Sequence, residues 1–250
     1  MIFSLDQAVT NQLPTLCVGL VVACGIDNTR ARPEVDALLD NTVRAAETRL
    51  AGINASEDPR VQPYRAAFSA LGMSPSRYPS SNIALLRRIA KGKGLWRVNP
   101  LVDLGNAISI SYGLPLGAHA MDLSCETLEL RFSRVDDVFV ELGRTDADPT
   151  LSPGELVYAV GNHVQTRRWT WRQSEHGKVT PETREVVFPI DGFTDANADQ
   201  VRAACRELAE LLNRYFGAKP ATYLIDTHHP QARRSITSQW RSQSSTKGQL

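Results

Sequence analysis

The sequence predicts an α+β protein, of the mixed α/β kind, in which a mostly helical first half packs on a largely antiparallel sheet. Three observations carry this prediction. One apolar, β-branched run near the N-terminus is followed by several segments with helical periodicity. Short segments of strand character then alternate with turn signals between residues 127 and 193. A strongly amphipathic stretch at 195–218 predicts a C-terminal helix.

The first half is expected to contain one strand and a series of helices. TLCVGLVVACG at 15–25 is apolar and ends at a glycine, which is typical of a buried strand. PEVDALLDNTVRAAETRLAG at 33–52 spaces its apolar residues three and four apart, begins at a proline and ends at a glycine, as amphipathic helices often do. Shorter patterns of the same kind predict helices at 59–73, 81–94 and 99–113.

The second half is expected to form the sheet. Successive segments predict strands at 127–134, 137–143, 155–162, 164–173 and 183–193. Short strands joined by turns favour antiparallel pairing. The helix expected at the end of this half carries apolar residues on one face, namely Val201, Cys205, Leu208, Leu211 and Leu212.

The last part of the sequence differs in composition. From Thr227 onward it is polar and poor in apolar residues, so it cannot bury enough surface to offset the entropy of ordering. After Asp226 it contains three arginines and one lysine but no acid. We expect a single domain over 1–226 and a flexible basic tail over 227–250, which is either a solvated end or a weak phosphate-contacting arm.

Charge and cysteine content narrow the class of protein. The 28 Lys and Arg residues nearly balance the 27 Asp and Glu residues, for a net charge of +1, which gives no overall electrostatic case for avid nucleic-acid binding. The four cysteines are scattered and form no CxxC pair, which indicates reduced thiols. The N-terminus lacks signal-peptide features and no apolar run suits a membrane helix, so we expect a cytoplasmic protein with no membrane partner.

The familiar catalytic motifs are absent from the sequence. It contains no Walker loop and no GxGxxG, HExxH or GxSxG pattern. Its five histidines share no metal-ligand spacing with carboxylates or thiols. The sequence therefore predicts no metal, no cofactor and no covalent nucleophile of a known arrangement.

One candidate site surrounds a turn in RVNPLVDLGNAISISYGLPLGAHAMD at 97–122. Asn106 and His119 flank the turn around Pro115. Asn and neutral His can each donate and accept a hydrogen bond, so the pair can hold a polar ligand or order a water molecule. The alternative is an Asn on a helix face and a His satisfied by the backbone.

A second candidate is RRWTWRQSEHGK at 167–178. In a strand, Trp169 and Trp171 would share one face, with Arg168 and Arg172 on the other. Aromatic rings interleaved with arginines can stack on bases and pair with phosphates. The alternative is a pair of core tryptophans with solvated arginines. The basic helix expected at 81–94 is a further candidate binding surface. The alternative is an ordinary helix whose outer face is charged and solvated.

The stretch SSNIALLRRIAKGKGLWRVNPLVDLGNAISISYGLPLGAHAMD resembles the B3/B4 domain of the bacterial phenylalanyl-tRNA synthetase beta subunit. That family has a V-V-D-x-T-N-Y-like helix and then G-x-P-x-H-A-F-D; LVDLGNAIS, Gly113, Pro115, His119 and Asp122 stand at the matching places. SEHGKVTPETREVVF is similar to the family's E-x-S-x-V-x-x-x-T segment. The likeness covers residues 77–193 and is greatest for free-standing B3/B4-domain proteins, which lack the synthetase body.

The resemblance implies a compact B3/B4-like fold with an editing pocket between helices and sheet. In the synthetase this pocket hydrolyses the ester of tyrosine wrongly attached to tRNA for phenylalanine. The family's pocket residues correspond to Asn106, His119 and Glu175 here. Because an aminoacyl ester is already activated, such a site needs a positioned water more than a covalent nucleophile, and the neighbouring adenosine hydroxyl assists.

The chain departs from the synthetase pattern in three places. Gly105 stands where the synthetase has Thr, which can widen or re-aim the pocket. One extra residue, Gly117 or Ala118, separates the proline from the histidine. Trp169 to Gln173 replace a Gly-Gly segment, so the amino acid removed need not be tyrosine.

These features together predict a trans-editing hydrolase that deacylates misacylated tRNA, with the aminoacylated acceptor end as partner and no role for DNA. The alternatives are a non-catalytic module that binds tRNA or an amino acid, and a hydrolase for small aminoacyl esters or amides. The sequence specifies neither the amino acid nor the oligomeric state. The expected catalytic residues are those named above, and the expected binding residues are Gly105, Pro115, Arg168, Trp169, Trp171 and Arg172.

Overall fold

A long antiparallel pair of strands forms the centre of the molecule. The computed structural model describes residues 1–233. In it β2 (Leu16–Cys24) pairs along its whole length with β8 (Glu185–Phe193). β3 (His119–Ala120) and β9 (Ala221–Ile225) complete a four-stranded antiparallel sheet in the order β3-β8-β2-β9. Because both faces of this sheet are covered, β2 is an almost unbroken apolar run rather than an alternating one.

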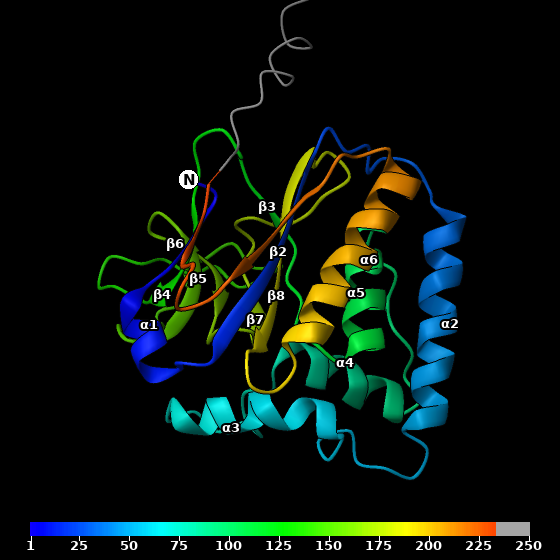
Figure 1. Ribbon diagram of the computed structural model, residues 1–250, viewed down its shortest axis with the longest axis horizontal. Helices are drawn as coiled ribbons and strands as arrows, with labels where there is room; N and C mark the ends of the chain where they lie inside the picture. The colour runs from blue at the N-terminus through cyan, green and yellow to red at the C-terminus, as the bar shows by residue number, and fades with distance from the viewer. Residues whose placement is uncertain (234–250) are drawn as a thin grey trace, which may run out of the picture.

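A second, six-stranded sheet covers one face of the first (Figure 1). Only the β1–β4 pair is parallel, and the other pairs are antiparallel. In spatial order its strands are β10 (Gln231–Ala232), β1 (Phe3–Leu5), β4 (Leu128–Phe132), β5 (Leu156–Val160), β6 (His163–Arg167) and β7 (Arg172–Gln173).

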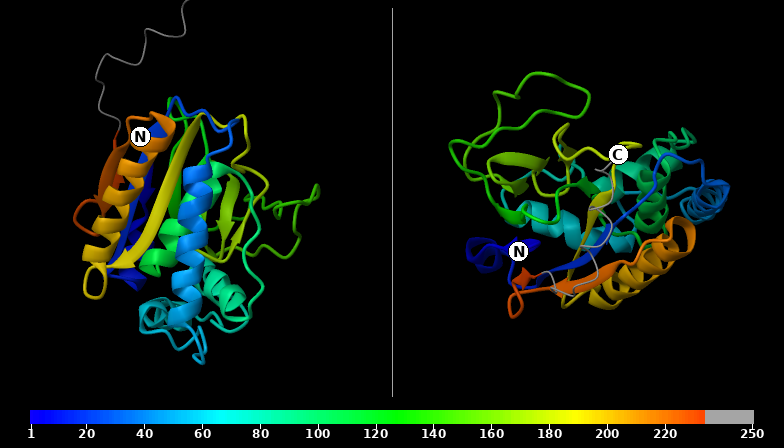
Figure 2. Two further views of the ribbon diagram at one scale, coloured as in Figure 1. Left: turned by 90° about the vertical axis from the view of Figure 1, so that its right-hand side faces the viewer. Right: turned by 90° about the horizontal axis from the view of Figure 1, so that it is seen from above.

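Helices cover the opposite face of the four-stranded sheet (Figures 1 and 2). α6 (Ala198–Phe216) packs on β2, β8 and β9, α5 (Pro100–Tyr112) lies beside it, and α2 (Pro33–Arg49) packs outside α5. The remaining helices are α1 (Gln7–Gln12), the short 3-10 helix Pro59–Val61, α3 (Gln62–Ala70) and α4 (Ser81–Ala90).

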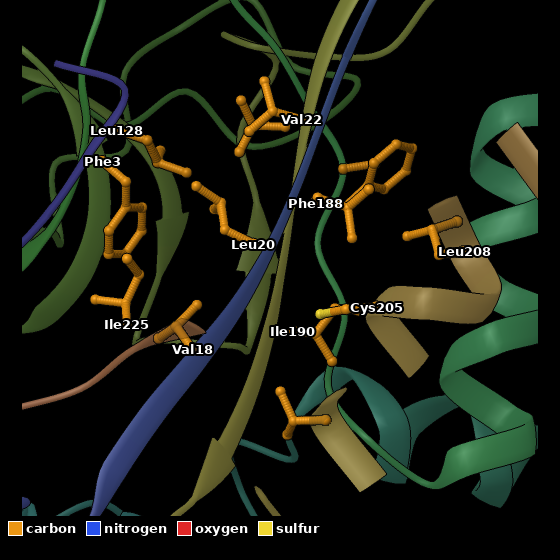
Figure 3. Packing of buried hydrophobic residues seen from close by; sticks show 14 of the residues in the cluster. Phe3, Val18, Leu20, Val22, Leu128, Phe188, Ile190, Cys205, Leu208 and Ile225 are labelled. Atoms are coloured by element: carbon orange, nitrogen blue, oxygen red, sulfur yellow. The ribbon is translucent and has the colours of Figure 1, made fainter. Parts of the chain in front are cut away.

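The alternation of side chains along the central strands builds the core on both faces. Figure 3 shows Val18 and Leu20 of β2 on the side of Phe3 and Leu128 from the six-stranded sheet. Phe188 and Ile190 of β8 lie on the other side with Cys205 and Leu208 of α6. A Cβ atom at Gly19 would overlap the side chains of Cys205 and Val201, so a glycine is needed there for α6 to approach the sheet.

The structure confirms the α+β class and the expected helices, whose apolar spacing is a local signal. Two strand predictions were wrong. Residues 137–143 form only isolated bridges, at Val138 and Glu141. The segment 164–173 is broken into β6 and β7 because Arg168 and Trp169 adopt left-handed backbone angles, with φ of 48° and 61°.

Three short strands were not expected from the sequence. β1, β3 and β10 are two or three residues long and exist through pairing with distant strands. β10 lies within the segment expected to be a tail, so sheet pairing extends past residue 226. The rest of that expected tail, 234–250, lies outside the described residues. Within 1–233, no helix is both long and apolar enough to cross a membrane.

Candidate functional site

A cavity of about 120 Å³ lies between the two sheets, next to the first residue of α4. Its apolar lining includes Leu116, Trp169 and Pro189. Ser81 and Trp171 also line it and are partly exposed, so the cavity reaches the surface. Its other polar lining residues are His119, Tyr158, Thr166, Thr170, Gln173 and Asp191.

His119 is the predicted site residue that the fold places in this cavity. β3 pairs with β8 with His119 opposite Val187, which fixes the backbone of the histidine beside the central sheet. The residue is 1% exposed, and neither ring nitrogen has a hydrogen-bond partner among the described residues. Burial lowers the pKa of His119 to about 4, so the ring is neutral at physiological pH. A neutral ring offers one donor and one acceptor to whatever enters the cavity.

Gly117 gives the His119 ring its space. A Cβ atom at position 117 would lie 2.9 Å from His119 Nε2 and 3.3 Å from the Pro189 side chain. Thr170, on the β6–β7 turn, adds another unsatisfied group, because its hydroxyl is buried without a partner. Buried polar groups in native proteins are nearly always paired, so unpaired groups that line one cavity indicate a ligand or water site.

Asp191 of β8 is the residue that the sequence prediction missed. Its carboxylate oxygen Oδ1 accepts hydrogen bonds from Tyr158 Oη at 2.6 Å and from Trp169 Nε1 at 2.7 Å. The residue is 1% exposed, and burial raises the pKa of its carboxyl to about 7 against the lowering effect of those hydrogen bonds. The available signal was an acid within VVFPIDGF, the otherwise apolar part of β8.

The predicted tryptophan pair is divided between core and cavity mouth. Trp169 is fully buried and packs on Phe68, with ring centroids 5.7 Å apart. Its backbone N–H donates to Leu156 O at 2.6 Å, which holds the left-handed turn against β5. Trp171 is only partly buried and meets Tyr78 edge to face at 4.9 Å.

The two arginines do not lie on the face opposite the tryptophans, so that prediction was wrong. The turn at 168–169 brings both guanidinium groups against Trp171, at 5.2 Å for Arg168 and 4.6 Å for Arg172. Arg168 also lies 4.0 Å from the Tyr78 ring centroid. The four side chains Tyr78, Arg168, Trp171 and Arg172 form what we call the mouth cluster. Its arginines are paired with Glu155 and Glu141, respectively.

Three other predicted residues lie outside the cavity lining. Asn106 is partly buried on α5, and no hydrogen bond from its side chain is seen within 1–233. Gly105 faces Leu116, since a Cβ atom there would lie 3.0 Å from Leu116 Cδ2. Its effect on the cavity is therefore through the packing of Leu116. Pro115 acts through its carbonyl oxygen, which accepts the backbone N–H of Asp191 at 3.1 Å.

Glu175 lies in the loop after β7 and joins two loops. Its Oε2 accepts the Gly143 N–H at 2.7 Å, and its Oε1 pairs with Lys178 at 2.9 Å. The hydrogen bond from Gly143, and after it the one from Lys178, lowers the pKa of the Glu175 carboxyl. The structure thus brings His119, Trp169 and Trp171 together with Asp191, while Asn106 and Glu175 lie elsewhere. In the described part of the chain, no three His, Cys, Asp or Glu side chains are grouped to hold a metal ion.

Comparisons with known proteins complete the description. Residues 63–217 match the model of the family described as the B3/4 domain. No curated protein sequence matched the chain. Among solved structures, an N-terminal fragment of the phenylalanyl-tRNA synthetase beta subunit from Pyrococcus horikoshii is similar, at 12% identity and a TM-score of 0.44. The match covers 88% of this chain and 50% of the fragment, so the chain spans half the length of that structure.

Proposed function

Because the chain belongs to the B3/4 domain family, we propose that it is a trans-editing hydrolase, which deacylates tRNA that carries a wrong amino acid. The observation that carries the proposal is His119. It is a buried, neutral histidine with both nitrogens unpaired, in a cavity that reaches the surface. The proposal places the protein in the cytoplasm, where aminoacyl-tRNA is made and used.

The reaction is the hydrolysis of an ester. A water oxygen attacks the carbonyl carbon of the aminoacyl group, the bond from that carbon to the ribose oxygen breaks, and the ribose oxygen takes a proton. A neutral His119 accepts a hydrogen bond from the water through one ring nitrogen and donates through the other. With a pKa of about 4, His119 is a weak base, so its role is to orient the water. The ribose hydroxyl next to the ester relays the proton.

The mouth cluster supplies the contact to RNA in this proposal. Trp171 and Tyr78 bring aromatic rings together with arginine guanidinium planes, and an unpaired base at the acceptor end can stack on either kind of plane. Arg168 and Arg172 stand beside them, and their partners Glu155 and Glu141 reduce the local positive charge. We therefore expect modest affinity for tRNA that falls with added salt.

The test is deacylation of a panel of radiolabelled aminoacyl-tRNAs by the purified protein. We expect selective release of one or a few amino acids, and we expect His119→Ala to lose it. His163→Ala is the matched control, because His163 is an exposed histidine of β6 that stacks on His176 and does not line the cavity. Ligand-dependent stabilisation without release would instead identify a non-catalytic tRNA or amino-acid binding module. Full activity of His119→Ala would refute the assignment of the site.

A further inference from the structure

Asp191 is a buried carboxyl without a cation. Among residues 1–233, no Lys, Arg or His forms an ion pair with it, and its only side-chain hydrogen bonds come from two neutral donors. The two arginines of the mouth cluster, Arg168 and Arg172, are already paired with Glu155 and Glu141. A buried carboxylate without a countercharge is unfavourable, so Asp191 either holds a proton or pairs with a cation that enters the cavity.

The surroundings of Asp191 orient it toward a ligand. Tyr158 and Trp169 both donate to Oδ1, and no donor to Oδ2 is found within the described residues. Both donors are rigid, since Trp169 and Tyr158 are at most 2% exposed. The Asp191 backbone is held as well, by its N–H to Pro115 O and by its own carbonyl, which accepts Tyr64 Oη at 2.9 Å. A carboxylate fixed in this way can receive N–H donors with little loss of entropy.

The same cavity contains groups for the rest of a small ligand. His119 and Thr170 present unpaired polar atoms to it, and Leu116 and Pro189 supply apolar surface. A cavity of about 150 Å³ holds a benzene molecule, so one of about 120 Å³ has room for a small aminoacyl group. An α-amino group has a pKa of about 7.7–8.0 and is largely protonated at neutral pH.

We propose that Asp191 binds the free ammonium group of the aminoacyl moiety and so restricts the site to amino acids whose α-amino group is unmodified. This inference rests on the proposed function for the identity of the ligand. It adds a specificity residue and a substrate class: aminoacyl groups are accepted, and N-acylated aminoacyl groups are rejected. An N-acyl group removes the charge and places an apolar substituent against Asp191.

The test measures binding apart from turnover. The probes are the amides of the standard amino acids and their N-acetyl counterparts, followed by thermal shift and then by calorimetry for those that bind. We expect at least one amide to bind and its N-acetyl form to bind about 10- to 100-fold more weakly, the range of one charged hydrogen bond. Asp191→Asn keeps an oxygen for Tyr158 and Trp169 but has no charge, and it should remove this preference.

Asp103→Asn is the matched control. Asp103 is also a buried carboxyl whose pKa is raised by burial, but it accepts the backbone N–H of Val98 and does not line the cavity. It should bind the amides like the parent protein. Circular dichroism and the unfolding midpoint of each variant show that the fold is retained.

The outcomes separate this inference from the proposed function. Ammonium-selective binding that depends on Asp191, in a protein that deacylates no tRNA, supports the inference and refutes the hydrolase. Deacylation of N-acetyl-aminoacyl-tRNA at the rate of the free form, or equal binding of both amide series, overturns the inference and leaves the hydrolase standing. If Asp191→Asn slows turnover of both substrate forms with binding unchanged, Asp191 acts on the water and the inference is wrong. Absence of any binding and of any release refutes both.

Discussion

Oδ1 of Asp191 lies 2.7 Å from the indole nitrogen of Trp169, so a carboxyl on the central sheet is joined to a turn of the second sheet. The Trp169 backbone has a left-handed φ of 61°, which is unfavourable for a bulky side chain. Burial of the ring, the indole hydrogen bond to Asp191 and the backbone hydrogen bond to Leu156 O offset that strain. The relationship ties the shape of the cavity to the packing between the two sheets.

Trp169→Phe tests whether the hydrogen bond between Trp169 and Asp191 contributes to stability. The change deletes the indole N–H and leaves a small void, so we expect the free energy of unfolding to fall by about 2–3 kcal/mol. The measurement is urea unfolding at neutral pH. Trp96→Phe is the control, because Trp96 is 71% exposed and its loss should change stability little. Equal effects of the two substitutions would show that the bond to Asp191 contributes nothing to stability.

Asp191→Asn is expected to stabilise the protein at neutral pH. The pKa of Asp191 rises from its ordinary value of 3.8 to about 7 in the fold, so the folded state holds a proton that the unfolded state releases. The contribution of this group is therefore fully present below pH 3.8 and is lost as the pH rises through 7. The stability advantage of Asp191→Asn should grow across this window by up to about 1.4 kcal/mol per pH unit.

The check on Asp191 is a series of denaturant titrations between these pH limits. Asp122→Asn serves as the control, since Asp122 is exposed and its pKa is lowered by hydrogen bonds from Ser124. That variant should show no advantage that grows with pH. A pH-independent difference between Asp191→Asn and the parent protein would mean that the carboxyl is ionised throughout.

His119→Gln tests the opposite dependence of stability on pH. Burial lowers the pKa of His119 from 6.5 to about 4, so below 6.5 the unfolded state takes up a proton that the folded state excludes. The stability that this group contributes is present above pH 6.5 and is lost as the pH falls toward 4. His119→Gln should therefore be less sensitive to acid than the parent protein, as measured by unfolding free energy across that range. Identical acid sensitivity of the two proteins would argue for an exposed or charged histidine.

Local signals account for most of the fold, and non-local ones for most of the site. The apolar spacing of α2 and α6 and the long run of β2 are properties of short segments, so they can be read from the sequence. β3 has two residues and exists because His119 pairs opposite Val187, far along the chain. The alternation of aromatic and polar residues around Trp169 is compatible with a strand and with a turn. Asp191 could not be identified from the sequence, because the role of an acid in an apolar strand depends on its hydrogen-bond partners Tyr158 and Trp169, which are distant in the chain.

Trp171→Ala tests the mouth cluster as the RNA contact. Stacking of a base on an aromatic side chain contributes about 1–3 kcal/mol, so we expect affinity for tRNA to fall by a corresponding factor. The measurement is filter binding at several salt concentrations. Trp96→Ala is the comparison, because Trp96 is an exposed tryptophan that lies under Arg88 of the basic helix α4. A greater loss for Trp96→Ala would place the RNA on that helix instead.

Gly117→Ala tests whether the position of the His119 ring matters for activity. The backbone at Gly117 is not left-handed, so an alanine is allowed there, but its Cβ would lie 2.9 Å from His119 Nε2. The ring must move away, and a displacement of about 1 Å at a reacting group can lower the rate about 100-fold. We expect that loss in single-turnover deacylation, with a stability change of about 1–2 kcal/mol. The imidazole resonances of His119 should shift with the ring, and an unchanged rate together with shifted resonances would show that the ring does not orient the attacking water.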